Sequence, residues 1–183
     1  MNLREKYRPT TIGELVGCKV FREAAATWSV DNCPSNLLFV GPPGVGKTSA
    51  AISLAKDMLG EFFDPMNFVV TNASDDRGIE YVRELKRISK QKAIGVGRRI
   101  IFLDEADSFT TPAQSAIFIL AANDISPIHA AIRDRCLTFE FKPVTDDSAV
   151  QRLNQVIEAE GMPVNWKEHV ASLLKLCNGS LRS

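Results

Sequence analysis

The sequence has 183 residues, of which 45% are hydrophobic and 24% are charged. These fractions are typical of a globular protein and exclude a disordered, collagen-like or coiled-coil chain, and the length predicts one main domain with at most a small second unit. The 22 basic residues equal the 22 acidic residues in number. This balance excludes a globally basic nucleic-acid-binding protein but not a local basic face.

The termini and the cysteines predict a cytoplasmic protein with no membrane partner. No apolar run approaches the ~18 to 20 residues that cross a bilayer, and the charged start MNLREKYRP is unlike a signal peptide. The cysteines lie far apart, which favours reduced thiols over a zinc site or a disulfide framework. They are Cys18, Cys33, Cys136 and Cys177.

Five short apolar runs, rich in β-branched and aromatic residues, predict strands that alternate with helical stretches. The runs are residues 36–40, 68–71, 99–103, 117–122 and 137–141. Such alternation predicts an α/β fold with a five-stranded parallel sheet and helices on both faces. We expect this domain to occupy residues 1–143.

Beyond residue 143 the strand pattern stops and two helices are predicted. Thr145 is suited to cap a helix that runs to about Glu160, and Asn165 with Glu168 forms a capping box for a second helix that ends near Asn178. Residues 144–183 are therefore predicted to form a small, partial, all-helical lid.

Residues 41–48 read GPPGVGKT and match the P-loop pattern GxxxxGK[ST], directly after a predicted strand and at the start of a helix. In such a loop, backbone N–H groups converge on phosphate oxygens, Lys47 reaches the β and γ phosphates, and the Thr48 hydroxyl ligates Mg²⁺. The pattern predicts ATP and Mg²⁺ as cofactors. The expected nucleotide contacts are Pro43, Gly44, Val45, Gly46, Lys47, Thr48 and Ser49.

An acidic pair, Asp104 and Glu105, follows the third predicted strand and has the form of a Walker B element. Asp104 is placed to hold Mg²⁺, and Glu105 is suited to orient and deprotonate the attacking water. Asn123 ends the next strand, so a parallel sheet would bring its amide beside the pair, where it is expected to bind the water or the γ-phosphate.

Four basic residues recur at i, i+3, i+4 and i+7 of a predicted helix, which places them on one face. They are Arg83, Lys86, Arg87 and Lys90. Two interpretations stay open: a solvated face paired in part with Glu80 and Glu84, or a contact with nucleic acid. Lys92, Arg98 and Arg99 are expected to continue the positive charge, and a second basic cluster lies at Arg4, Lys6 and Arg8.

Two further arginines are candidates. Arg135 immediately precedes the fifth predicted strand, and Arg182 lies in the sequence Gly-Ser-Leu-Arg of residues 179–182. Each is compatible with an ordinary ion pair or with a role in the site.

In this order, the motifs resemble the AAA+ ATPase module of small subunits of the replication factor C family of sliding-clamp loaders, over essentially the whole chain. Residues 5–9 (EKYRP) resemble the adenine-side motif and residues 72–79 (NASDDRGI) the most distinctive segment of the family. Asn123 matches sensor 1, residues 134–136 are similar to the Ser-Arg-Cys motif, and residues 179–182 resemble sensor 2.

The resemblance implies roles and partners. Tyr7, Arg8, Val16 and Gly17 would flank the adenine, and the basic helix would follow the DNA backbone. Lys47, Glu105, Asn123 and Arg182 would act on the nucleotide of their own chain, whereas Arg135 would reach the ATP of a neighbouring subunit. The implied partners are other loader subunits in a pentamer, a sliding clamp and primer-template DNA, in the cytoplasm at the nucleoid or in a eukaryotic nucleus.

The chain departs from the family pattern in several places. Cys18 stands where the family commonly has Gln, and Asp134 where it has Ser. The chain ends at Ser183, without the collar domain that holds the ring, so a stable isolated pentamer is not expected. Only 19 positions separate Asp104 from Asn123, whereas a parallel crossover takes about a dozen residues before its next strand and the family has a longer, arginine-bearing helix here. Either this helix is truncated to about one turn, or a segment of the chain is omitted here; we favour an omission.

The leading functional interpretation is an ATP-hydrolysing clamp-loader subunit. One alternative is another DNA-acting AAA+ motor, for branch migration or fork maintenance, against which residues 72–79 argue. The other is a nucleotide-binding ring scaffold without turnover, against which Glu105 argues. A small-molecule kinase is disfavoured because this chain has the sensor motifs where such kinases have a lid with substrate-binding arginines.

Overall fold

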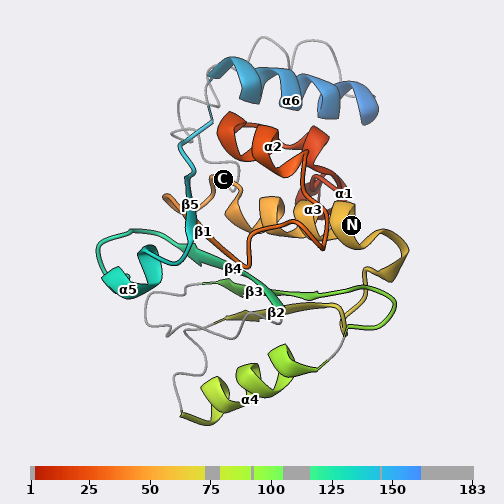
Figure 1. Cartoon of the computed structure of the whole chain (residues 1–183). Coiled ribbons are helices and arrows are strands. Elements are labelled where there is room, and N and C mark those ends of the chain that lie inside the picture. The colour runs from red at the N-terminus through yellow and green to blue at the C-terminus, as the bar shows by residue number, and fades with distance from the viewer. Residues whose placement is uncertain (1–2, 73–78, 92, 105–115, 145, 162–183) are drawn as a thin grey trace.

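The computed structural model describes residues 3–72, 79–91, 93–104, 116–144 and 146–161 (Figure 1). Sequence predictions that fall on the remaining residues, among them the Thr145 cap, the helix at 165–178 and most of residues 72–79, lie outside the described part.

A five-stranded parallel sheet forms the centre of the molecule (Figure 1). Its strands are β1 (Asn36–Val40), β2 (Phe68–Asn72), β3 (Arg99–Asp104), β4 (Ala116–Ala122) and β5 (Leu137–Glu140). They lie in the order β2-β3-β4-β1-β5, and every neighbouring pair is parallel. All seven residues of β4 are buried, as expected for a central strand covered on both faces. The predicted sheet is confirmed.

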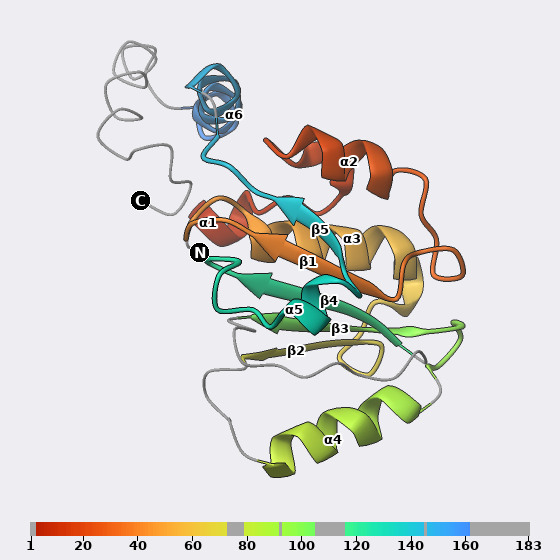
Figure 2. The ribbon, with the colours of Figure 1, turned by 60° about the vertical axis from the view of Figure 1, so that its left-hand side comes forward.

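Helices cover both faces of the sheet, as predicted (Figure 2). One face carries α2 (Lys19–Ala25) and α3 (Lys47–Leu59), and the other carries α4 (Ile79–Lys90) and α5 (Ala130–Arg133). Successive strand residues point to opposite faces. In β1, Leu37 and Phe39 therefore join the cluster beneath α2 and α3, whereas Leu38 and Val40 join the cluster with α4 and α5.

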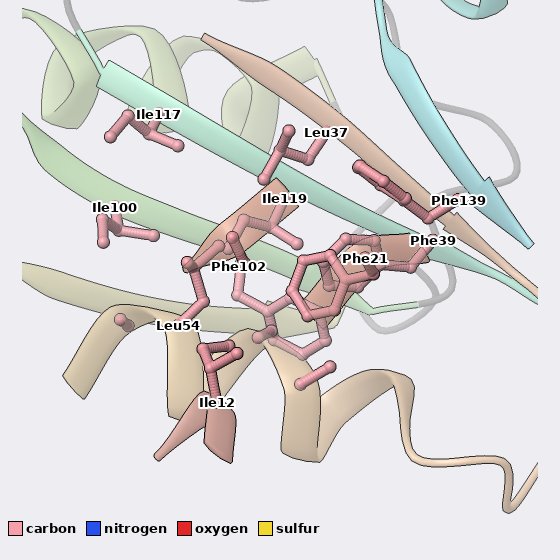
Figure 3. Packing of buried hydrophobic residues seen from close by; sticks show 14 of the residues in the cluster. Ile12, Phe21, Leu37, Phe39, Leu54, Ile100, Phe102, Ile117, Ile119 and Phe139 are labelled. Atoms are coloured by element: carbon pink, nitrogen blue, oxygen red, sulfur yellow. The ribbon is translucent and has the colours of Figure 1, made fainter. Parts of the chain in front are cut away.

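Aromatic rings fasten α2 to the sheet (Figure 3). Phe21 is fully buried, with ring centroids 4.9 Å from Phe39 and 5.3 Å from Phe139. Ile12, in the short 3-10 helix η1 (Ile12–Glu14), and Leu54 of α3 belong to the same cluster. This packing fixes the path of the chain between η1 and α2.

Helix α6 (Asp146–Ala159) lies beyond α2, away from the sheet (Figures 1 and 2). A small third cluster supports it, formed by Val16, Val144, Val150, Leu153 and Ile157. Gly161, at φ +62°, follows the helix. Two short elements complete the described part, α1 (Leu3–Lys6) and η2 (Gly60–Phe62). No helix in the described ranges has the length and apolarity needed to span a membrane.

Candidate nucleotide-binding site

The P-loop connects β1 to α3, as the sequence predicts. Gly44 and Gly46 have φ values of +86° and +98°, which lie in the left-handed region that glycine tolerates. At Gly41 the requirement is space, because a Cβ atom would lie 2.0 Å from the carbonyl oxygen of Phe141. The glycines therefore allow the loop to turn tightly beside the end of β5.

Lys47 has a side chain directed back into the loop, and the residue is only 7% exposed. Its Nζ donates hydrogen bonds to the carbonyl oxygens of Gly41 (2.5 Å) and Pro42 (2.9 Å) and to Oδ1 of Asn123 (3.1 Å). A buried ammonium needs such acceptors. Asn123 is thus brought to the P-loop lysine, at the sheet edge where the sequence predicts its amide beside the acidic pair.

Thr48 meets the Walker B residue. Its Oγ1 donates to Oδ2 of Asp104 at 3.2 Å, and Asp104 is the last residue of β3, the strand next to β4. The carboxyl ends of these parallel strands share one sheet edge with the P-loop. Hydroxyl and carboxylate oxygens are ligands that Mg²⁺ prefers, so the pair fits the predicted cation.

The other predicted P-loop residues lie in the loop or in the first turn of α3. They are Pro43, Gly44, Val45, Gly46 and Ser49. Glu105 and Arg182 lie outside the described residues.

Of the four predicted adenine contacts, the structure brings only two to a pocket. Val16 and Gly17 line a pocket of about 360 Å³. The remaining lining residues are Gly13, Glu14, Leu15 and Arg22, with Gln151, Arg152 and Gln155 of α6. The pocket lies near the P-loop edge of the sheet. Cys18, which follows the lining residue Gly17, donates from Sγ to the carbonyl oxygen of Glu140 at 3.6 Å, and Glu140 is the last residue of β5 at that edge.

Tyr7 and Arg8 do not line this pocket. The Tyr7 hydroxyl donates to Oε1 of Glu160 at 2.7 Å. The backbone carbonyl oxygen of Tyr7 accepts a hydrogen bond from the Arg152 guanidinium at 2.9 Å. Lys6 Nζ lies 2.6 Å from the same Glu160 oxygen. The basic N-terminal cluster is therefore not available as a whole to a polyanion, because the charge of Lys6 is paired.

These contacts shift titrations in the expected directions. Hydrogen bonds from Lys6 and then Tyr7 lower the pKa of Glu160, and the bond to Glu160 raises the pKa of both donors. At the pocket, the backbone N–H of Thr10 lowers the pKa of Glu14. Both carboxylates are thus held in their charged form.

Arg135 lies at the opposite edge of the sheet from the P-loop. Its carbonyl oxygen accepts from Nδ2 of Asn36 at 3.4 Å, and Asn36 is the first residue of β1, whereas the P-loop follows the last. Five strand residues span ~16 Å. The side chain of Arg135 is exposed.

The basic face of α4 is present but partly paired. Arg83, Arg87 and Lys90 are exposed, and Arg87 forms a two-bond ion pair with Glu84, of 2.6 and 2.7 Å. The predicted pairing with Glu84 is confirmed; the side chains of Glu80 and Lys86 lie outside the description.

The expectation that Arg98 and Arg99 extend the exposed positive charge is wrong. The Arg98 guanidinium donates to the carbonyl oxygens of Val30 and Cys33, both at 2.8 Å. Arg99 is only 5% exposed. The loop before β1 presents backbone acceptors to the interior, and Arg98 satisfies them.

Sequence reasoning missed the residues that join the N-terminal segment to the helices. Each of these residues makes a hydrogen bond to a partner more than 40 positions away in the sequence; they are Asp57, Arg152 and Glu160. In the sequence each is an ordinary charge on a helix, and no local signal distinguishes it from its neighbours.

Comparison with known proteins supports the class that the fold and P-loop define. The sequence model of the ATPase family associated with various cellular activities (AAA) matches residues 37–116. The Thermotoga maritima RuvB Holliday junction branch migration motor superposes with a TM-score of 0.71 at 15% identity, over 96% of this chain and 62% of that chain. At this identity the likeness shows the fold alone. The class is a P-loop protein of the AAA type.

Sequence relatives narrow the family. The replication factor C small subunit of Archaeoglobus fulgidus is 40% identical over 193 residues, and that of Natronomonas pharaonis is 37% identical over 191 residues. Each alignment covers 97% of this chain, which spans 60% and 58% of the relatives' lengths. Over nearly its whole length the chain is thus similar in sequence to replication factor C small subunits.

The alignment lengths bear on the short connection between β3 and β4. The A. fulgidus alignment extends over 193 residues, but it covers only 97% of the 183 residues here. That relative therefore holds about 15 residues that this chain lacks within the aligned part. A difference of this size is compatible with the short connection between Asp104 and Asn123. Residues 105–115 themselves lie outside the described part.

Proposed function

We propose that this chain binds ATP with Mg²⁺ and hydrolyses it as a subunit of a clamp loader that places a sliding clamp on primer-template DNA. The observation that carries the proposal is the meeting of Lys47, Thr48, Asp104 and Asn123 at one sheet edge, in a chain whose relatives at 35–40% identity are replication factor C small subunits.

The phosphates are assigned to the P-loop. The Lys47 ammonium, held by the carbonyls of residues 41 and 42, exchanges those acceptors for phosphate oxygens when the nucleotide enters. Thr48 and Asp104 hold the Mg²⁺, which, when bound, neutralises charge on the β and γ phosphates. Glu105 orients the attacking water and takes its proton, and Asn123 fixes the water or the γ-phosphate.

The base is assigned to the pocket beside Val16 and Gly17. A volume of about 360 Å³ lies within the range of small-molecule sites. Gln151 and Gln155 offer amide donors and acceptors to the ring edge. Tyr7 and Arg8 are assigned to flank the base although they do not line this pocket, and Arg182 is assigned to contact the nucleotide from the lid.

Arg135 is assigned to the ATP of the neighbouring subunit. Its place at the sheet edge opposite Lys47 supports a role in trans, because its side chain would have to cross the length of β1 to reach its own γ-phosphate. Such a finger supplies positive charge to the transition state. Catalysis therefore depends on assembly into a ring, for which the pentamer is proposed.

The exposed face of α4 is assigned to primer-template DNA, with Arg83, Lys86, Arg87 and Lys90 as phosphate contacts. Contacts of this kind position the protein on the duplex without reading its sequence. A loader acts where DNA is replicated, which is the cytoplasm at the nucleoid or a eukaryotic nucleus.

A domain boundary is proposed near residue 143, between the ATPase domain (1–143) and the partial lid (144–183). Limited proteolysis is expected to cut first at residues 143–145. A first cut between residues 37 and 103, with the linker protected, would contradict the boundary.

The test of function is the ATPase rate of the chain assembled with its partner subunits and a clamp. We expect primer-template DNA together with the clamp to stimulate hydrolysis, and a Holliday junction not to do so. Stimulation by the junction would favour a branch-migration motor. Nucleotide binding with no turnover in the complete assembly would favour a ring scaffold.

A further inference from the structure

Residues 6–12 form a strap that connects the helix of the P-loop to α6. On the α3 side, Ser53 Oγ donates to the carbonyl oxygen of Pro9 at 3.0 Å. The backbone N–H of Ile12 donates to Oδ2 of Asp57 at 2.7 Å. Ser53 and Asp57 both belong to α3, which begins at Lys47. The strap is thus anchored to the element that carries the phosphate-binding residues.

On the other side the strap is anchored at two points, to Arg152 of α6 and to Glu160, the residue that follows the helix. Glu160 Oε1 accepts from Lys6 and Tyr7, and Arg152 donates to the carbonyl oxygen of Tyr7. Residues 152 and 160 are about two helical turns apart, ~12 Å along the axis. Two attachments at this separation set the direction of the helix as well as its distance from the strap.

The same hydrogen bonds hold the walls of the pocket. Arg152 both lines the pocket and binds the strap. On the facing wall, Glu14 accepts from the backbone N–H (2.7 Å) and Oγ1 (3.1 Å) of Thr10, a strap residue. Arg22, another lining residue, has a buried Nε without a hydrogen-bond partner in the described part. The pocket therefore has fixed walls and an unused donor.

We propose that Glu160 is a positioning residue for the nucleotide base: by holding Lys6 and Tyr7 it keeps α6 on the strap, so that the base pocket exists before the ligand enters. This inference rests on the proposed function. Preorganisation of a site removes an ordering cost from binding. The P-loop residues do not line this pocket, and the strap is bonded to α3 through Ser53 and Asp57 rather than through Lys47 or Thr48. The effect of Glu160 is therefore expected at the base and not at the phosphates.

The test compares ATP with inorganic tripolyphosphate, which has no base, by calorimetric titration of the 183-residue chain in Mg²⁺. Glu160→Ala is expected to weaken ATP binding roughly 3- to 10-fold, because the loss of the bonds to Lys6 and Tyr7 removes a free energy of about the size of one net hydrogen bond from the order of the pocket. Tripolyphosphate binding is expected to stay unchanged, because that ligand does not use the pocket. Tyr7→Phe removes one hydroxyl and is expected to act in the same direction. Asp147→Asn, at an exposed carboxylate on α6, serves as the matched control.

Unchanged ATP affinity in Glu160→Ala, or an equal loss for both ligands, overturns the proposal. If that variant does not fold, Tyr7→Phe decides by the same comparison. Hydrogen exchange without nucleotide gives a second readout: faster exchange in α6 and residues 13–17 of the Glu160 variant supports the strap, and unchanged exchange overturns it. A wild-type chain that binds neither ligand contradicts the proposed function instead, and the exchange result still decides the role of Glu160.

Discussion

At the scale of single residues, the site depends on side chains that find a partner far away in sequence. Thr48 and Asp104 are 56 positions apart and Lys47 and Asn123 are 76 apart, yet both pairs are within hydrogen-bond distance. The first pair is the proposed Mg²⁺ site. The second holds the proposed phosphate-binding ammonium in place.

Thr48→Val is expected to weaken ATP binding in Mg²⁺ roughly 10-fold, because the hydroxyl that would ligate the cation is lost while the shape of the side chain is kept. In EDTA the variant and the wild type are expected to bind alike. Calorimetry under both conditions measures the difference, with Thr138→Val, on the exposed side of β5, as the control. An equal loss in EDTA would show that Thr48 acts other than through the metal.

Arg98→Ala is expected to lower the free energy of unfolding by about 2 kcal/mol, because the carbonyl groups of Val30 and Cys33 lose a charged donor. Denaturant titration measures the change, and Lys19→Ala, at an exposed ion pair, serves as control with an expected change below about 0.5 kcal/mol.

A thiol reports on the same loop. Burial, opposed by the nearby charge of Arg98, raises the pKa of the Cys33 thiol to about 12, so Cys33 is expected to resist alkylation in the wild type. In Arg98→Ala the loss of the positive charge removes an influence that lowers the thiol pKa, so faster alkylation of Cys33 in this variant would report that the loop has loosened and exposed the thiol. A variant with wild-type stability and an unreactive Cys33 would contradict the structural role of Arg98.

At the scale of elements, the P-loop is confined by the strand beside it. Gly41 faces the backbone of Phe141, whereas a Cβ atom at Gly46 would have nothing within 4 Å. The two glycines therefore separate a steric requirement from a conformational one.

Gly46→Ala is expected to cost ~1 to 2 kcal/mol of unfolding free energy, the strain of a left-handed residue with a Cβ atom. Gly41→Ala is expected to cost more, because its neighbour is backbone and cannot rotate away. Denaturant titration of both variants measures the order. A Gly41 variant more stable than the Gly46 variant would show that the backbone at Phe141 moves aside with little loss of free energy.

Helix α4 gives a test of DNA binding. In the assembled loader, Arg83→Ala and Lys90→Ala are each expected to weaken binding to primer-template DNA and to reduce the slope of log affinity against log salt by about one. Glu84→Gln is expected to act oppositely, because it releases Arg87 from its ion pair. Lys142→Ala, an exposed lysine beside Glu140, is the control. Unchanged slopes would favour the alternative interpretation, in which the basic residues of α4 form a solvated face without DNA contact.

At the scale of the whole molecule, binding and hydrolysis of ATP are expected to separate. The phosphate-binding residues belong to one chain, but Arg135 lies at the far edge of the sheet. We expect the 183-residue chain to bind ATP measurably and to hydrolyse it very slowly, since loss of an arginine finger costs ~10³ to 10⁵ in rate.

Arg135→Ala is accordingly expected to change the slow rate of the isolated chain little and to reduce the rate of the assembled ring. Single-turnover hydrolysis with and without the partner subunits measures both. Fast turnover by the isolated chain that collapses in Arg135→Ala would move Arg135 to a role in its own site.

The sequence by itself determined the class of fold and the phosphate end of the site. Apolar runs and the P-loop are local patterns, so the parallel sheet, the helices on both faces and a helix directly after the P-loop follow from neighbouring residues. Asn123 and Asp104 were also predictable, because the ends of parallel strands share an edge.

Only the tertiary structure decided the strand order, the inward direction of Arg98 and the strap that ends at Glu160. A charged residue on a helix has the same local pattern whether it meets solvent or a distant carbonyl group. Its partner is chosen by how the elements pack, which for Tyr7 and Glu160 joins positions 153 residues apart. Contacts at that separation leave no periodicity or motif in the chain.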